Sequence, residues 1–158
     1  MKVFISGPMK NDPNHPQRFK EWEDRINLLG QSPFNPAWMQ VDKSWNRNEL
    51  INIDRAAMDA CDIVIFLSGW ERASGCHAEM KYALGCSKFI FFEDYLRKGL
   101  TTASPEHLMG GASNGTYERV RQFEDCLMEQ LAKESAKKHT STHTDEYGCT
   151  HISKQEEK

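Results

Sequence analysis

The sequence lacks the long apolar runs that would place it in a membrane. No stretch of its 158 residues approaches the about 18 consecutive apolar residues that are needed to cross a bilayer. The opening residues, MKVFISGPMK, also lack the apolar core and the small-residue cleavage site of a secretory signal peptide. We therefore expect a cytosolic protein with no membrane partner.

Paired cysteines and an excess of one charge are also missing. The five cysteines form no CxxC pair and are odd in number, which favours reduced thiols over a disulfide framework. Lys and Arg number 20 against 23 Asp and Glu, the two signs are interspersed, and the net charge is -3. We therefore do not expect the protein to bind duplex nucleic acid. The composition is compatible with a small anionic ligand.

Apolar residues become scarce from about residue 137 onward, where Lys, His, Thr, Ser and Glu dominate. Such a segment cannot offset its ordering entropy, so we predict one folded domain at residues 1–136 and a polar, disordered tail at residues 137–158. The tail contains His139, His143, Cys149 and His151, whose spacing matches no standard metal site. We predict no bound metal.

Short apolar runs alternate with helical patterns along residues 1–136. The runs predict strands at 2–6, at 32–36, at 62–67 and at 88–92. Apolar residues that recur every three or four positions predict helices at about 16–29, 47–60, 74–85 and 120–131. This alternation predicts a doubly wound α/β fold, flavodoxin- or Rossmann-like, with a mainly parallel sheet of about five strands. The Gly- and Ser-rich stretch 100–115 predicts a mobile loop.

Loops that follow parallel strands gather at one edge of the sheet, where ligands of such folds bind. Three predicted loops meet this condition, at residues 7–9, 35–38 and 69–75. The loop at residues 69–75 leads into a predicted helix that begins at Ser74. The free backbone N–H groups at the start of a helix favour binding of a phosphate or another anion. We therefore expect the three loops to line one cleft.

Four stretches between about residues 2 and 93 together carry a family resemblance: VFISGPM, FNPAWM, IDRAAMDACDIVIFL and GWERASGCHAEMKYALG. In combination they resemble the nucleoside 2-deoxyribosyltransferase superfamily. That superfamily includes transferases that exchange bases on deoxyribose, nucleoside 5'-monophosphate N-glycosidases, and small phage-borne relatives with a GWE...G...E pattern. The chain resembles the phage-borne group most.

The resemblance implies roles for two carboxylates. Glu79 corresponds to the nucleophile that attacks the anomeric carbon while the base departs, and Asp54 to the aspartate that assists near the sugar or the base. The implied chemistry is that of a retaining glycosidase, with a covalent sugar ester and no cofactor. Ser74 corresponds in part to a serine that holds the 5'-phosphate. The chain departs from the family at Ala73, where Ser or Asp is common.

Each candidate also has a purely structural interpretation. Glu79 and Asp54 would then be surface carboxylates, and Ser74 a helix N-cap. Arg72 would lie in solvent instead of supplying positive charge to a ligand. Trp38 and Trp70 would pack in the core or between subunits instead of stacking on a base. The substrate-binding candidates are Gly7, Pro8, Met9, Asn35, Trp38, Trp70, Arg72, Ser74 and Gly75.

These patterns and the resemblance predict an enzyme that hydrolyses the N-glycosidic bond of a nucleoside 5'-monophosphate. Base exchange by a deoxyribosyltransferase is the alternative. A non-catalytic nucleotide-binding module, which Ala73 favours, and a phage interaction protein that docks through the His-rich tail stay open. The expected partners are a small-molecule nucleotide or nucleoside and, by resemblance, further copies of the chain in a homodimer or larger homo-oligomer.

Overall fold

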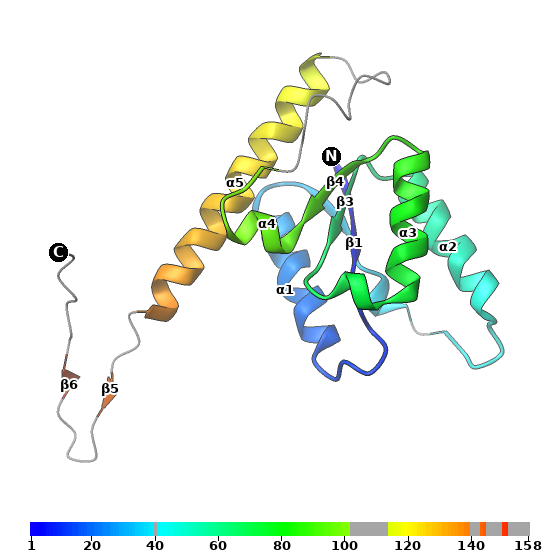
Figure 1. The fold of residues 1–158 in the computed structure, drawn as a ribbon, viewed down its shortest axis with the longest axis horizontal. Coiled ribbons are helices and arrows are strands. Elements are labelled where there is room, and N and C mark those ends of the chain that lie inside the picture. Colours follow the sequence, from blue (N-terminus) through cyan, green and yellow to red (C-terminus); the bar gives the residue numbers. More distant parts are fainter. Residues whose placement is uncertain (40, 102–113, 140–142, 145–149, 152–158) are drawn as a thin grey trace.

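The computed structural model describes residues 1–39, 41–101, 114–139, 143–144 and 150–151 (Figure 1). Its centre is a four-stranded parallel sheet with the order β2-β1-β3-β4. The strands are β1 (Lys2–Ser6), β2 (Ser32–Phe34), β3 (Ile63–Phe66) and β4 (Phe89–Phe92). This arrangement confirms the predicted doubly wound α/β fold, and the described residues supply four strands to the sheet. β2 contains Pro33 and lies at the sheet edge, where the missing N–H of proline is tolerated.

Helices cover both faces of the sheet (Figure 1). One face carries α1 (His15–Leu28), α4 (Glu93–Arg97) and α5 (Asn114–His139), and the other carries α2 (Arg47–Asp59) and α3 (Ser74–Gly85). Two short 3-10 turns, η1 (Pro36–Trp38) and η2 (Trp70–Arg72), follow β2 and β3. The four predicted helices are all present. The short α4 was not predicted, because a single turn leaves too little periodicity in the sequence.

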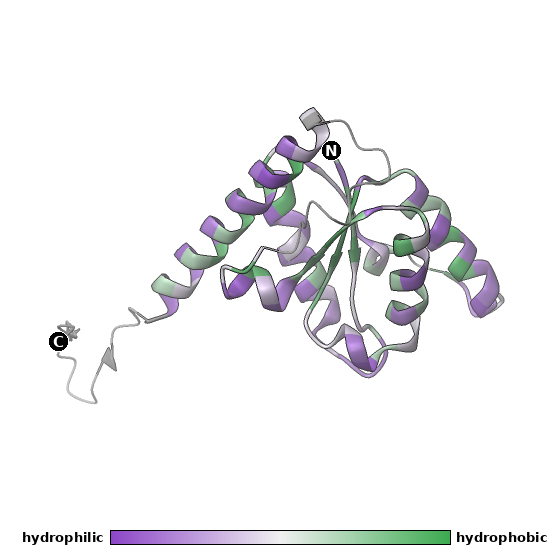
Figure 2. Ribbon diagram, turned by 45° about the horizontal axis from the view of Figure 1, so that its top comes forward, coloured by the Kyte–Doolittle hydropathy of each residue, from purple (hydrophilic) through white to green (hydrophobic). Residues whose placement is uncertain are grey.

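Alternate residues of the strands supply the two halves of the core. Val3 and Ile5 of β1 face one cluster with α1, α4 and α5, whereas Phe4 faces the other cluster with α2 and α3. Because both faces of the parallel sheet are covered, the strands are apolar at nearly every position. Figure 2 shows the result, with hydrophobic strands at the centre and hydrophilic outer faces on the helices.

Two glycines bring the loops after β1 and β3 together at the carboxyl edge of the sheet. The register pairs Ser6 with Phe66, so the two strands end at the same level. A Cβ at Gly7 would lie only 3.0 Å from the Cβ of Leu67, so a larger residue would push the loops apart. Gly69 has φ of +84°, a left-handed conformation that costs other residues about 1–2 kcal/mol.

The carboxyl-terminal region lies partly outside the described residues. α5 continues to His139, beyond the predicted start of the tail, and β5 (His143–Thr144) pairs with β6 (Thr150–His151). Most of the predicted loop at 100–115 and the rest of the predicted tail lie outside the described residues, so their predicted disorder stays a prediction. Within the described ranges, no helix is both long and apolar enough to cross a bilayer.

Candidate active site

A cavity of about 620 Å³ opens at the carboxyl edge of the sheet. Its walls come from the loops after β1 and β3 and from helices α2 and α3, so segments far apart in the sequence meet there. The predicted site residues that line it are Gly7, Pro8, Met9, Asp54, Arg72, Ser74, Gly75 and Glu79. Two of the three predicted loops, with both predicted carboxylates, therefore share one cavity.

Glu79 lies in the second turn of α3 and lines the cavity. Its Oε2 accepts a hydrogen bond from the hydroxyl of Ser6, the buried last residue of β1. The pKa of Glu79 is raised to about 7. Burial is the main cause and the nearby Asp54 adds to it, while the Ser6 hydroxyl partly opposes both by stabilising the ionised form. Glu79 is therefore not a solvent-facing helix residue, and its carboxyl group changes protonation near neutral pH.

Asp54 enters the same cavity from α2. Its Oδ1 is buried and has no hydrogen-bond partner among the described residues. This burial raises the pKa of Asp54 to about 6. Two carboxyl groups thus face one cavity with pKa values far above those of exposed carboxylates, a feature that is common at catalytic sites.

Four cationic residues also line the cavity: Lys10, Arg47, Arg55 and Arg72. Arg47 Nη2 donates to Ser74 Oγ over 3.2 Å, which fixes the guanidinium beside the first turn of α3. The Arg55 guanidinium lies over the Tyr82 ring, 5.3 Å from its centroid. The positive charges of the other three residues favour an anionic ligand in the cavity.

The start of α3 differs from the predicted capping. Ala73, and not Ser74, occupies the N-cap position, and the helix has no side-chain cap. The prediction of Ser74 as N-cap is therefore wrong by one residue. Among the described residues no side chain caps this end of α3, and Ser74, Gly75 and Cys76, which carry its first N–H groups, line the cavity.

The loop after β2 does not share this cavity, contrary to the prediction. Asn35 Nδ2 and Trp38 Nε1 both donate to Glu23 Oε2 on α1, over 3.0 Å and 2.6 Å. The strand order explains the difference, because β1 separates β2 from β3 and the loop after β2 turns toward α1. Trp38 and Asn35 are outside the cavity lining.

Trp70 also lies outside the cavity lining. Its ring packs against Phe66 and Phe92, with ring centroids 5.3 Å and 5.4 Å away, and against His77. The structural interpretation therefore holds for this tryptophan. It anchors the η2 turn onto the core face below α3.

The polar residues at the cavity that were not singled out from the sequence include Ser6, Lys10, Arg47 and Arg55. Ser6 is the last polar residue of a buried strand directly before Gly7, and that position alone marks the ligand edge of a parallel sheet. Arg47 precedes Asp54 by two helical turns, which puts both on one face of α2. Lys10 follows the Gly7–Met9 segment directly.

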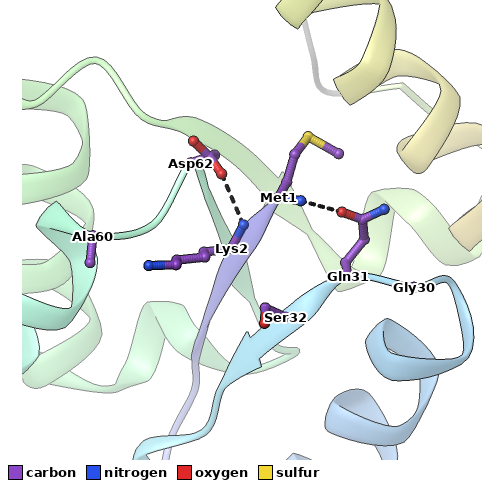
Figure 3. A pocket seen from close by; sticks show the side chains of 7 residues that line it. All are labelled: Met1, Lys2, Gly30, Gln31, Ser32, Ala60 and Asp62. Atoms are coloured by element: carbon purple, nitrogen blue, oxygen red, sulfur yellow. Dashed lines mark hydrogen bonds between the residues drawn. The ribbon is translucent and has the colours of Figure 1, made fainter.

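A second hollow of about 500 Å³ lies at the amino ends of the strands, opposite the cavity described above (Figure 3). There the backbone N–H of Lys2 binds Asp62 Oδ2 over 2.8 Å, and the amino terminus of Met1 binds Gln31 Oε1. The hollow lies at the amino ends of the strands, whereas ligands of such folds bind at the carboxyl ends. In the described part of the chain, no three His, Cys, Asp or Glu side chains gather to hold a metal ion.

The sequence was compared with known protein families. A family model described as "Domain of unknown function (DUF4406)" matches residues 1–92. The chain belongs to the DUF4406 family. The matched region of this DUF4406 protein runs from β1 to β4 and contains every cavity residue named above.

Among solved structures, the DUF4406 protein is similar to the CMP N-glycosidase BcmB of Clostridium botulinum. The two chains are 24% identical, the match covers 60% of this chain and 74% of the other, and the TM-score is 0.41. The comparison with curated proteins gave no match. The chemistry of the cavity therefore has to follow from its own residues.

Proposed function

We propose that the protein cleaves the N-glycosidic bond of a nucleoside or deoxynucleoside 5'-monophosphate and releases the free base. The observation that carries this proposal is the pair formed by Glu79 and Asp54 in one cationic cavity at the carboxyl edge of the sheet. Both residues have the positions that the resemblance to nucleoside 2-deoxyribosyltransferases assigns to the nucleophile and its assistant. The cavity thus holds two carboxyl groups for the sugar and cationic groups for the phosphate.

In the first step, a carboxylate oxygen of Glu79 forms a bond to C1' of the sugar while the bond from C1' to the base nitrogen breaks. The base nitrogen keeps the electron pair of that bond and takes the proton of Asp54, because an anionic base would leave poorly. Ser6 holds the ionised form of Glu79 in place through its hydrogen bond. The product is a glycosyl ester on Glu79 and a neutral free base.

In the second step, a water molecule attacks C1' and the ester bond to Glu79 breaks. The ionised Asp54 takes a proton from this water and returns to its starting state. The sugar phosphate leaves with a hydroxyl at C1'. A second free base in place of water would give base exchange, so the transferase alternative uses the same residues and differs only in the acceptor.

The preference for a 5'-phosphate rests on the cations around the cavity. Arg47 and Ser74 are hydrogen-bonded to each other beside the uncapped first turn of α3, and Arg72 lines the cavity close by in sequence. A phosphate here would receive guanidinium and backbone N–H donors together, which is a favourable combination for an anion. A neutral nucleoside would leave these cations without a partner.

The test is an assay of base release. The purified protein is incubated with each common ribonucleoside and deoxyribonucleoside 5'-monophosphate and, separately, with the matching nucleosides that lack the phosphate. Each substrate is tested with and without a second free base, and free base is quantified by chromatography. We expect base release without an acceptor, faster from monophosphates than from nucleosides, and lost in Glu79→Gln. The exposed Glu118 supplies the matched control, because Glu118→Gln removes the same charge far from the cavity lining.

Two outcomes would reject this function. New nucleotide formed only in the presence of an acceptor base would show a transferase. Nucleotide binding that survives Glu79→Gln, with no base released by the unmodified protein across the panel, would show a non-catalytic binding module.

A further inference from the structure

Arg18 lies outside the cavity lining, yet it binds both loops that form the cavity. Its Nη1 donates to Asp12 Oδ2 over 2.7 Å, and its Nη2 donates to the backbone oxygen of Ser68 over 2.8 Å. Asp12 lies in the loop after β1, and Ser68 lies in the loop after β3. One guanidinium on α1 therefore links the two loops from a position outside the cavity lining.

The partner on the first loop is held firmly. The Oδ1 of Asp12 accepts the N–H of Asn14 over 2.9 Å, and the backbone oxygen of Asp12 contacts His15 Nδ1 over 2.7 Å. The hydrogen bond from Arg18 is the main cause that lowers the pKa of Asp12, so the carboxylate stays ionised in this pair. The residues just before Asp12, from Gly7 to Asn11, line the cavity.

The partner on the second loop is fixed from the opposite side. The N–H of Ser68 donates to Glu93 Oε2 over 2.9 Å, and its hydroxyl donates to Asp94 Oδ1. Glu93 is itself buried and paired with Arg97. Ser68 is therefore held in place by α4, and the bonds of Arg18 fix the position of the first loop relative to Ser68.

We propose that Arg18 is a positioning residue that sets the distance between the two loops of the cavity, and thereby its affinity for the 5'-phosphate. Lys10 on the first loop and Arg72 on the second line the cavity on either side of this connection. Glu79 is held separately by Ser6, so the reacting carboxylate depends less on Arg18. The kinetic part of this inference rests on the proposed function, whereas the connection between the loops does not.

The test compares Arg18→Met with Arg25→Met. Arg25 lies on the same helix and forms a similar ion pair, 2.6 Å from Glu134 Oε2, but it contacts neither cavity loop. Loss of either pair should lower stability, but only loss of Arg18 should free the cavity loops. Arg18→Lys is the conservative variant, because its single ammonium group keeps the charge but not the two-pronged geometry.

Hydrogen exchange followed by mass spectrometry measures the loops directly. We expect peptides that cover residues 7–14 and 68–75 to exchange about tenfold faster in Arg18→Met, with α2 unchanged, because local opening governs exchange there. Arg25→Met should leave both peptides unchanged, and Arg18→Lys should give an intermediate rate. Unchanged exchange of the two loops in Arg18→Met, or equal acceleration in Arg25→Met, would overturn the inference.

Kinetics measures the consequence for the ligand. For the preferred monophosphate, Arg18→Met should raise KM about tenfold and change kcat less than about threefold, since small misplacements of binding groups have effects of this size. Turnover of the matching nucleoside, which lacks the phosphate, should stay unchanged. An equal loss with both substrates would overturn the role in phosphate affinity. Faster loop exchange in a protein that releases no base would reject the proposed function and retain the connection between the loops.

Discussion

Replacing the partly buried acid Glu79 by glutamine should stabilise the protein at alkaline pH while it abolishes activity. The pKa of Glu79 rises from its ordinary value of 4.5 to about 7 in the folded protein, chiefly through burial. The folded state therefore binds more protons than the unfolded state between these two values, and stability falls as the pH rises through that window. Below 4.5 the carboxyl group is neutral in both states and this loss is absent.

The pKa rise gives the size of the effect. At about 1.4 kcal/mol for each pKa unit, ionised Glu79 lowers the free energy of unfolding by about 3 kcal/mol above pH 7. The amide of Glu79→Gln is neutral at every pH and still has an oxygen that can accept from Ser6. Allowing for burial of the amide, we expect a gain of about 2 kcal/mol at about pH 8, or about 5–10 °C in Tm. At about pH 5 the gain should nearly vanish.

Thermal unfolding followed by circular dichroism at several pH values measures this difference. Glu118→Gln is the matched control, because its side chain is exposed and the substitution should leave the Tm nearly unchanged at every pH. A Glu79→Gln variant whose Tm differs from that of the unmodified protein by the same amount at both pH values would refute the argument. So would a variant that is less stable at alkaline pH.

Three further substitutions test the site from other sides. The pKa values of Asp54 and Glu79 are about 6 and about 7, so the pH profile of kcat/KM should be bell-shaped with its maximum between these two values. Asp54→Asn should remove the alkaline limb of this profile and lower kcat about a hundredfold or more. Ser6→Ala removes the hydrogen bond that favours ionised Glu79, so the profile should move to higher pH and kcat should fall about tenfold; an unmoved profile would deny Ser6 this role. Trp38→Ala should leave KM unchanged, because Trp38 lies outside the cavity lining and binds Glu23; a large rise in KM would mean that Trp38 does reach the substrate.

The fold was predictable because its signals are local and strong. The run from Ile63 to Leu67 is apolar at every position, as a strand buried on both faces requires, and the structure places it at the centre of the sheet. Helix periodicity also located α1, α2, α3 and α5. The single-turn α4 escaped prediction, because one turn leaves too little periodicity in the sequence.

The site was predictable in part. Glu79 and Asp54 followed from the family resemblance, and the loops after β1 and β3 followed from the rule on parallel sheets. The rule failed for Asn35 and Trp38 because strand order is not written in local sequence: β2 lies beyond β1, one strand removed from the cavity. Ser6 escaped because its role depends on a contact with Glu79, far away in the sequence. The oligomeric state and the role of the tail stay predictions.

The central claim is that Glu79 forms a covalent bond to the sugar. The most direct measurement is the intact mass of the protein, taken after it is mixed with a cleaved monophosphate and quenched in acid within milliseconds to seconds, followed by peptide mapping. The proposal predicts a mass increase of one sugar phosphate on a peptide that contains Glu79, absent in Glu79→Gln and present in Glu118→Gln. Release of base with no adduct at any time point, or an adduct on another residue, would contradict it.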